Sequence, residues 1–446
     1  MFSSSGVSII LQFVFFYLLS KIYAPADYGL YGIFNVYAAT LGNLASFGYN
    51  QAFILPKEET KFKHLLHLTI FLSTLTCLLF AVAMMVFGHW TLHQLGHQQL
   101  GWYIHLVAPI AWLMIIDRIS SDWAVRVKSF KNQMWTSVTA TVVSRCYNLA
   151  HGLLIGPNAI GLVLTTAWQH TLRAILYFRF VIPNAKQTLV TAWDPPAMLA
   201  MARTYGRYPT YVHWSNVLVI FSAGLPAALL PFFGYSLVDL GYYVHALVLL
   251  DIPIRLMGAG IASVFTQKAS EILNDRPHEL WRHGYALFRN MLWLSLVFLA
   301  IVLVFGEWGY GLVFGENWQK AGLLAEVLAL HFFFRMISSP LSAIFFVIKA
   351  EKQNFYFHFA LTSARILSLW TAASLQLDFM AVMWWYGLTN AAFYLLYLGM
   401  ILRLLGGSVW PLITKTVVVA VLVIAVACVI RFAIFNQHSP LLYGIW

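Results

Sequence analysis

Charged residues are scarce in this chain, and their scarcity excludes most classes of soluble protein. Only 10% of the 446 residues are Asp, Glu, Lys or Arg, whereas 61% are hydrophobic and the mean hydropathy is +0.74. Soluble domains carry about 25% charged residues. The composition therefore excludes a soluble enzyme, a soluble nucleic-acid-binding module and a disordered chain, and it predicts a polytopic membrane protein.

Cysteines are few and catalytic motifs are absent from the sequence. The three cysteines neither pair at loop spacings nor form a CxxC motif, which predicts free thiols in the protein core without a disulfide or zinc site. The sequence contains no Walker A, GxSxG or HExxH motif. These absences predict no catalytic residue, no metal site and no enzymatic activity.

Long apolar runs account for most of the chain. Because one crossing needs about 20 apolar residues, hydropathy predicts six helices, a more polar segment, six further helices and one last apolar run. The predicted spans are residues 4–22, 29–55, 65–88, 101–120, 133–155, 159–182, 210–232, 239–265, 288–306, 325–348, 354–375, 379–402 and 410–433. The predicted organisation is an N-terminal lobe at 1–182, a cytoplasmic connection at 183–209, a C-terminal lobe at 210–402, and an extra helix with its tail at 403–446.

The distribution of Lys and Arg predicts the orientation in the membrane. Most of these residues fall in the connections on one side, whereas the connections on the other side hold only Lys21, Lys320 and Arg431. Short cytoplasmic loops are enriched in Lys and Arg. We therefore expect a cytoplasmic N-terminus and, if the last run spans the membrane, an external C-terminus.

A short motif occurs once in each half of the chain. Asp27-Tyr-Gly29-Leu-Tyr31 opens the second predicted helix, and Asp239-Leu-Gly241-Tyr-Tyr243 opens the eighth, 212 residues later. In each copy the Asp can cap a helix start while the Gly allows a turn. Six crossings return the chain to the same side, so the spacing predicts two six-helix bundles of parallel pseudo-two-fold symmetry, an arrangement used for alternating access.

Two segments carry a family resemblance. The turn Tyr23-Ala-Pro-Ala-Asp-Tyr-Gly29 lies between two apolar helices, and residues 250–270 combine a proline, a run of small residues and a closing basic turn. Both resemble polysaccharide flippases of the Wzx type, in the multidrug/oligosaccharidyl-lipid/polysaccharide exporter superfamily. The resemblance implies two bundles around a central cavity. It also implies that undecaprenyl-pyrophosphate-linked oligosaccharide, as for O-antigen, capsule or exopolysaccharide, is moved across the bacterial inner membrane. The implied partners are this substrate, membrane lipids and other polysaccharide assembly proteins.

Four of the arginines inside predicted spans are the main candidates for substrate binding. An arginine at bilayer depth costs about 2.5–3.5 kcal/mol on insertion scales unless it faces water or a partner. Guanidinium groups match phosphate oxygens in a bidentate manner. We therefore expect a hydrated cavity that binds a pyrophosphate through these residues, with snorkelling or structural ion pairing as the alternative; they are Arg145, Arg255, Arg335 and Arg365.

Uncharged polar residues at depth complete the candidate binding site. Asn35, Asn43 and Asn50 are spaced by eight and seven residues, which places them on one face of the second predicted helix. His213 and Asn216 lie together on the seventh. Such groups suit sugar hydroxyls, although hydrogen bonding between helices explains them equally well.

Asp251 is the predicted coupling carboxylate. It lies four residues before Arg255, so either a fixed i,i+4 ion pair or an exchangeable proton is consistent with the sequence. The coupling ion would be H⁺ or Na⁺. Two other functions remain open: an ion-coupled drug antiporter of the same fold, and a membrane polysaccharide polymerase or glycosyltransferase. The surplus of Arg over acids disfavours the first, and the short external loops disfavour the second.

Overall fold

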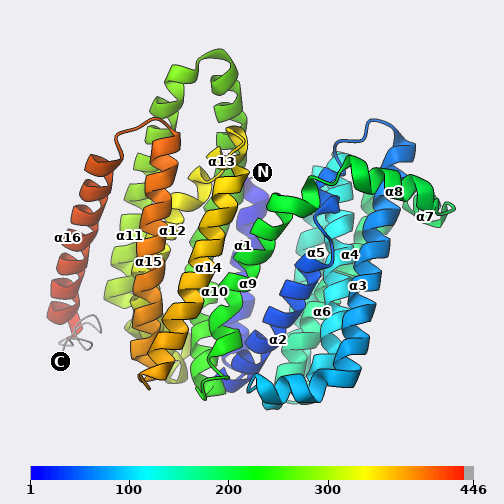
Figure 1. Cartoon of the computed structure of the whole chain (residues 1–446). Helices are drawn as coiled ribbons and strands as arrows, with labels where there is room; N and C mark the ends of the chain where they lie inside the picture. Colours follow the sequence, from blue (N-terminus) through cyan, green and yellow to red (C-terminus); the bar gives the residue numbers. More distant parts are fainter. Residues whose placement is uncertain (1, 436–446) are drawn as a thin grey trace. The chain divides into compact units, whose positions relative to one another are not determined.

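The computed structural model describes residues 2–435, and it describes side chains there except those of residues 2–10, 211–212 and 256–259. The described chain is almost entirely helical (Figure 1). Its thirteen long helices are α1 (Phe2–Ser20), α2 (Pro25–Leu44), α3 (Glu59–Gln94), α4 (Ile104–Arg126), α5 (Phe130–Leu154), α6 (Ala159–Leu176), α9 (His213–Leu229), α10 (Leu237–Asp275), α11 (Leu280–Phe314), α12 (Gln319–Leu341), α14 (Glu351–Ser374), α15 (Phe379–Leu404) and α16 (Val409–Phe435). Three short helices complete the set: α7 (Ala185–Val190), α8 (Pro195–Thr204) and α13 (Ile344–Val347).

Each of the thirteen predicted spans corresponds to one long helix. Within residues 2–435, eight candidate spans are long and apolar enough by themselves to cross a membrane. The last predicted run is the continuous helix α16, whereas the predicted external C-terminus lies outside the described residues. The cysteines are free, but Cys146 is exposed, so a core position was wrong for it.

One predicted span ends earlier than hydropathy indicates. Helix α2 ends at Leu44 because Phe47 and Gly48 adopt left-handed backbone angles, with φ of 49° and 73°. A short 3₁₀ turn, η1 (Tyr49–Ala52), follows. Asn50 therefore lies outside α2, and its predicted place on one helical face with Asn43 was wrong.

The helices form two compact units. The N-terminal unit comprises Ile10–Gly241, and the C-terminal unit comprises Tyr242–Trp446 together with Met1–Ile9. In the N-terminal unit, α2, α4 and α6 pack against one another, with α3 against α4, α5 against α6 and α9 against α2. In the C-terminal unit, α12 is the central helix, since it packs against both α11 and α15 and is largely buried, whereas α16 packs mainly against α11.

The two copies of the repeated motif contact each other at the starts of α2 and α10. A β-carbon on Gly29 would lie 2.0 Å from the Leu237 carbonyl oxygen, and one on Gly241 would lie 1.8 Å from the Pro25 carbonyl oxygen. Pro25 and Leu237 are separated by 212 residues, as are the two glycines. Each contact is therefore the counterpart of the other, as a two-fold relation between the turns requires.

The predicted capping role of the acidic residue is confirmed at Asp27, whereas in the second copy Ser236 caps the backbone and Asp239 bonds the capping hydroxyl. The Asp27 carboxylate accepts the backbone N–H of Ala24, at 3.1 Å. At the second copy, Asp239 and Ser236 bond reciprocally, since the Ser236 hydroxyl donates to the carboxylate at 2.6 Å and accepts the Asp239 N–H at 3.1 Å. These bonds satisfy backbone groups that helix starts leave without partners.

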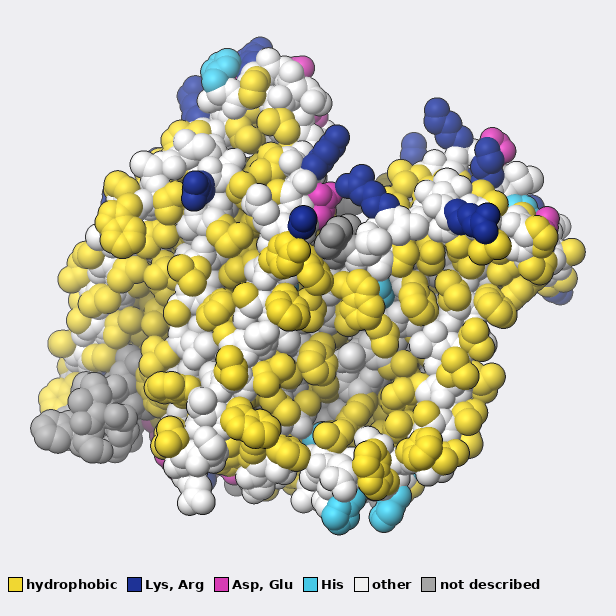
Figure 2. All heavy atoms as spheres, in the orientation of Figure 1, with side chains coloured by type: hydrophobic (Ala, Val, Ile, Leu, Met, Phe, Trp, Pro, Cys, Tyr) yellow, Lys and Arg dark blue, Asp and Glu magenta, His cyan; other side chains and the backbone are white. Residues whose placement is uncertain are grey.

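Basic side chains gather at one end of the helices in each unit. Figure 2 shows Lys and Arg at that end, while the flanks of the visible face are mainly hydrophobic. In the C-terminal unit the hairpin of α10 and α11 projects beyond the neighbouring helix ends (Figure 1) and carries Lys268, Arg276 and Arg282. Apolar flanks with basic ends are the pattern of a multi-pass membrane protein.

Candidate functional site

A polar cavity lies among α2, α4 and α6 of the N-terminal unit. Its volume is about 310 Å³. Four of the lining residues are charged, two of each sign. The lining consists of Gly42, Asn43, Met114, Asp117, Arg118, Ser121, Asp122, His170 and Arg173. All three helices place these residues toward their C-terminal ends, so the cavity lies at the same end of the unit as the basic residues.

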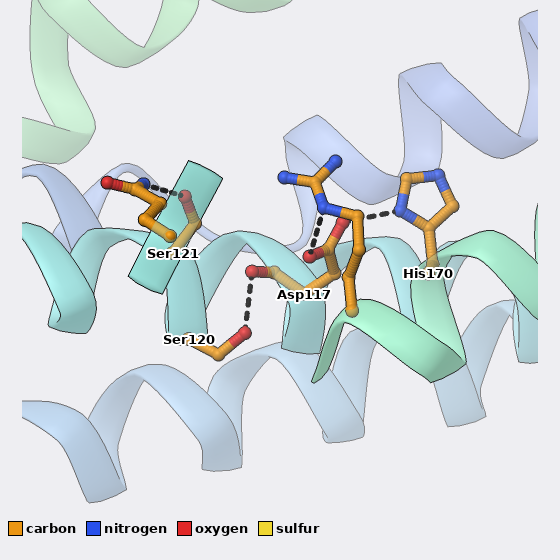
Figure 3. A network of polar contacts seen from close by, with 6 residues as sticks. Asp117, Ser120, Ser121 and His170 are labelled. Atoms are coloured by element: carbon orange, nitrogen blue, oxygen red, sulfur yellow. Dashed lines mark hydrogen bonds and ion pairs between the residues drawn. The ribbon is translucent and has the colours of Figure 1, made fainter. Parts of the chain in front are cut away.

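Asp117 is the centre of a network at this cavity (Figure 3). Its side chain is only 5% exposed, with His170 Nδ1 at 2.6 Å from Oδ2 and Arg173 Nε at 3.3 Å from Oδ1. The Ser120 hydroxyl donates to the Asp117 backbone carbonyl at 2.8 Å. Burying a carboxylate is costly unless partners compensate the charge. The two basic partners on α6 therefore fix the Asp117 carboxylate in one position.

The remaining lining residues keep more of their bonding capacity for a ligand. Arg118 is exposed, and its Nη1 donates to Asn43 Oδ1 at 2.5 Å. Asn50 Nδ2 donates to one carboxylate oxygen of Asp122, at 2.6 Å. Gln133 Nε2 donates to the Ser121 hydroxyl at 3.0 Å. Two carboxylates against two guanidinium groups leave the lining without net charge when His170 is neutral.

Four predicted site residues of the N-terminal unit do not line this cavity. His213 is buried and stacks on Phe47, with ring centroids 6.2 Å apart. Asn35, Asn216 and Arg145 are half-buried. Arg145 makes no ion pair within the described part of the chain, although it lies close enough to interact electrostatically with Tyr28. Only Asn43 of the predicted set contributes to the cavity.

Five charged or titratable lining residues were not predicted from the sequence. The reason is that Arg118 and Arg173 lie near helix ends, where they are indistinguishable from residues that set orientation. A signal was available, since Arg118 and Asp122 are four residues apart on α4 and therefore share one helical face. The missed residues are Asp117, Arg118, Asp122, His170 and Arg173.

In the C-terminal unit, Asp251 lies between two of the predicted arginines. Its Oδ1 is 2.8 Å from Arg335 Nη1, and its Oδ2 is 3.5 Å from Arg255 Nη2. The i,i+4 pair is therefore formed, but the shorter contact joins α10 to α12. The Arg255 side chain is 61% exposed, whereas that of Arg335 is 26% exposed.

Arg365 is the most deeply buried of the four predicted arginines. It is 5% exposed on α14, and its Nε donates to Asn390 Oδ1 on α15 at 2.5 Å. The guanidinium also lies over the Tyr386 ring, 5.9 Å from the centroid. Arg255 and Arg335 share the single carboxylate of Asp251, which leaves these two guanidinium groups with one surplus positive charge.

A second charged cluster ties α16 to the C-terminal unit. Arg431 is 3% exposed, with Nη2 at 2.6 Å from Glu307 Oε2 and Nη1 in contact with Glu326 Oε2. The Glu307 N–H donates to Glu326 Oε1 at 2.7 Å. The absence of a side chain at Gly306 leaves room for Glu326, because a β-carbon there would lie only 2.6 Å from the Glu326 side chain. The prediction that Arg431 lies in an external connection was wrong.

A metal site receives no support from these clusters. Among the side chains that the structure describes, three His, Cys, Asp or Glu side chains do not come together as metal ligands.

Comparisons with known proteins agree with this architecture. The sequence model of a family described as polysaccharide biosynthesis protein matches residues 18–323. A solved structure titled as the inward-facing conformation of a multidrug resistance MATE family transporter of the MOP superfamily is similar, with a TM-score of 0.68 and 12% identity; 93% of this chain and 96% of that chain are covered. A MATE structure in the bent conformation has a TM-score of 0.56 and 12% identity, with 94% and 95% covered. A search of curated protein sequences gave no match.

Proposed function

Because the chain belongs to the polysaccharide biosynthesis protein family and has the fold of MATE transporters, we propose that it is a flippase for a polyprenyl-pyrophosphate-linked oligosaccharide. Family and fold point to a transporter rather than an enzyme, which disfavours a polymerase or glycosyltransferase. The substrate crosses the bacterial cytoplasmic membrane from the inner to the outer leaflet by alternating access. The N-terminus is cytoplasmic in this proposal, since the basic helix ends then face the cytoplasm.

The surplus of positive charge in the C-terminal unit is the observation that carries this proposal. Arg335 is partly buried inside the unit, and the single carboxylate of Asp251 serves both Arg335 and Arg255. A pyrophosphate supplies the anions that this arrangement lacks. Several charge-assisted hydrogen bonds of modest strength allow both binding and release. Arg145, Asn35, His213 and Asn216 remain predicted contacts of the same substrate.

Asp251 is the proposed coupling carboxylate. Protonation would remove its charge and release Arg335 from an ion pair of 2.8 Å. A transported pyrophosphate could then replace the carboxylate as the partner of Arg335. An H⁺ gradient would thereby bias the two states of the transporter. Na⁺ is the alternative coupling ion.

An ion-coupled drug antiporter is the second candidate. The observation in its favour is the buried carboxylate of Asp117 beside a cavity, because antiporters use core carboxylates to bind cations. The two basic partners of Asp117 weigh against it, since they occupy the oxygens that a cation would need.

Deletion of the gene in the source organism tests the proposed function. We expect a lipid-linked oligosaccharide to accumulate and surface polysaccharide to disappear. Arg335→Ala and Arg365→Ala should fail to restore polysaccharide, whereas Arg→Lys at either position should restore part of it, because the charge remains but the planar fork is lost. Arg282→Ala is the matched control, since Arg282 is exposed on α11. Unchanged lipid-linked intermediates and full polysaccharide output in the deletion strain would reject the flippase.

A further inference from the structure

The cavity of the N-terminal unit differs in chemistry from the arginine-rich interior of the C-terminal unit. Its guanidinium groups, Arg118 and Arg173, are matched by the carboxylates of Asp117 and Asp122. An anion would be attracted by the first pair and repelled by the second, and a cation would meet the reverse. The lining therefore disfavours ligands with a strong net charge.

The same lining suits a ligand with many hydroxyl groups. Each hydroxyl both donates and accepts a hydrogen bond, so it can bridge a carboxylate and a guanidinium that lie close together. The cavity offers acceptors on Asp122 and Asn43 beside the donors of Arg118. Its volume of about 310 Å³ lies at the lower end of the range for small-molecule pockets.

The network around Asp117 gives this cavity a rigid wall. His170 and Arg173 hold the carboxylate from α6, and Ser120 bonds its backbone from α4 (Figure 3). Sites that discriminate between polar ligands need groups with fixed positions, because an unpaired buried group then penalises the wrong ligand. Asp117 is accordingly a positioning residue rather than a direct contact.

We propose that this cavity binds a sugar residue of the transported lipid-linked oligosaccharide, with Asn43, Arg118 and Asp122 as the contacts that read its hydroxyl groups. The inference rests on the proposed flippase function and assigns the carbohydrate part of the substrate to the N-terminal unit. It predicts that these three residues contribute to the choice of oligosaccharide, whereas the arginines of the C-terminal unit bind the pyrophosphate of any such lipid.

Binding measurements with two lipids test the inference. The first probe is the lipid-linked oligosaccharide extracted from the deletion strain, and the second is polyprenyl pyrophosphate without sugar. Both are titrated against the full-length protein in nanodiscs. We expect Arg118→Gln and Asp122→Asn to weaken binding of the first lipid by about tenfold, the effect of losing one charge-assisted hydrogen bond, and to leave binding of the second unchanged.

Controls separate this effect from loss of charge or loss of fold. Lys131→Gln removes an exposed positive charge from α5 outside the cavity and should alter neither affinity. Met114→Trp fills the cavity without changing charge and should also weaken only the sugar-bearing lipid. Arg335→Ala should weaken both lipids. Thermal stability near that of the wild type confirms that each variant is folded.

The outcomes distinguish the inference from the function on which it rests. Equal weakening of both lipids by the cavity variants, or no weakening of either, overturns the sugar site while the flippase proposal stands. The absence of an accumulated lipid-linked oligosaccharide in the deletion strain overturns the proposed function itself.

Discussion

Asp117 in the N-terminal unit and Asp251 in the C-terminal unit each meet two basic side chains, but their surroundings differ. Asp117 borders a cavity in which acids and bases are matched. Asp251 is shared by Arg255 and Arg335, while Arg365 is buried on α14 with an amide partner, Asn390. A matched lining favours a neutral polar ligand, and a surplus of cations favours an anion. Two units with the same type of helical architecture can therefore serve different parts of one substrate.

The largest predicted effect comes from the ion cluster of the C-terminal unit. Arg431→Met leaves the carboxylates of Glu307 and Glu326 without their cation, and removing one partner of a buried ion pair costs about 3–5 kcal/mol. Arg173→Met in the N-terminal unit should cost clearly less, because His170 continues to hold Asp117. Melting temperatures of the purified variants in detergent measure the difference. Equal losses for the two variants would remove the structural distinction between the clusters.

The sequence predicted the helices better than it predicted these clusters. Hydropathy located the thirteen long helices, and the repeated Asp-x-Gly-x-Tyr motif located two equivalent helix starts. The early end of α2 was missed, because the left-handed backbone at Phe47 depends on how the loop packs. From the apolar composition alone, the span was predicted to continue through Asn50 to residue 55.

The charged clusters were missed because each assembles residues from distant parts of the chain. Asp117 and His170 are on α4 and α6, and Glu307 and Arg431 are on α11 and α16. A single sequence records each charge but not its partner. The pair of Asp251 and Arg255 was foreseen because four residues separate them on one helix, whereas the shorter contact with Arg335 was not.

The repeated glycines provide the next prediction, at a point where the two halves of the chain are alike. Gly29→Ala and Gly241→Ala each place a β-carbon within 2.0 Å of a backbone carbonyl oxygen, so the starts of α2 and α10 must separate. Overpacking of this kind costs about 1–3 kcal/mol. Because the two contacts are counterparts, the two variants should lower the melting temperature by similar amounts. Gly309→Ala is the control, because a β-carbon there meets no atom within 4 Å. A large effect of only one of the two would contradict the two-fold relation.

Transport assays of variants at Asp117 and Asp251 test whether the two aspartates have different roles. Asp251→Asn removes the carboxylate shared by Arg335 and Arg255, and we expect output of surface polysaccharide to fall about tenfold with a weaker dependence on the ion gradient. Asp117→Asn should reduce output through sugar binding and keep the dependence on the gradient. Vesicle uptake of lipid-linked oligosaccharide, measured with and without a proton gradient, reports both quantities. Unchanged transport and unchanged gradient dependence in Asp251→Asn would remove its coupling role.

The smallest predicted effect concerns a histidine that joins elements of the N-terminal unit without any charge. His97 follows α3 and is buried. Its Nε2 donates a hydrogen bond to the Ala228 carbonyl on α9, at 2.8 Å. Its Nδ1 accepts a hydrogen bond from the Tyr37 hydroxyl on α2, also at 2.8 Å. Burial lowers the pKa of His97, although the bond to the Ala228 carbonyl acts in the opposite direction. The folded protein therefore binds this proton less readily than the unfolded chain does, whose histidine has a pKa of about 6.5. Its contribution to stability is present above that pH and is lost as the pH falls below it.

His97→Gln removes this titration and keeps both hydrogen bonds, since a glutamine amide can donate to Ala228 and accept from Tyr37. We expect the wild type to lose more stability than the variant between pH 8 and pH 5.5, because only the wild type carries a buried imidazole whose pKa is lowered in the folded state. Melting temperatures at the two pH values give the measurement, and exposed His93→Gln serves as the control. If His97→Gln loses as much stability on acidification as the wild type, His97 is not the group whose neutrality matters.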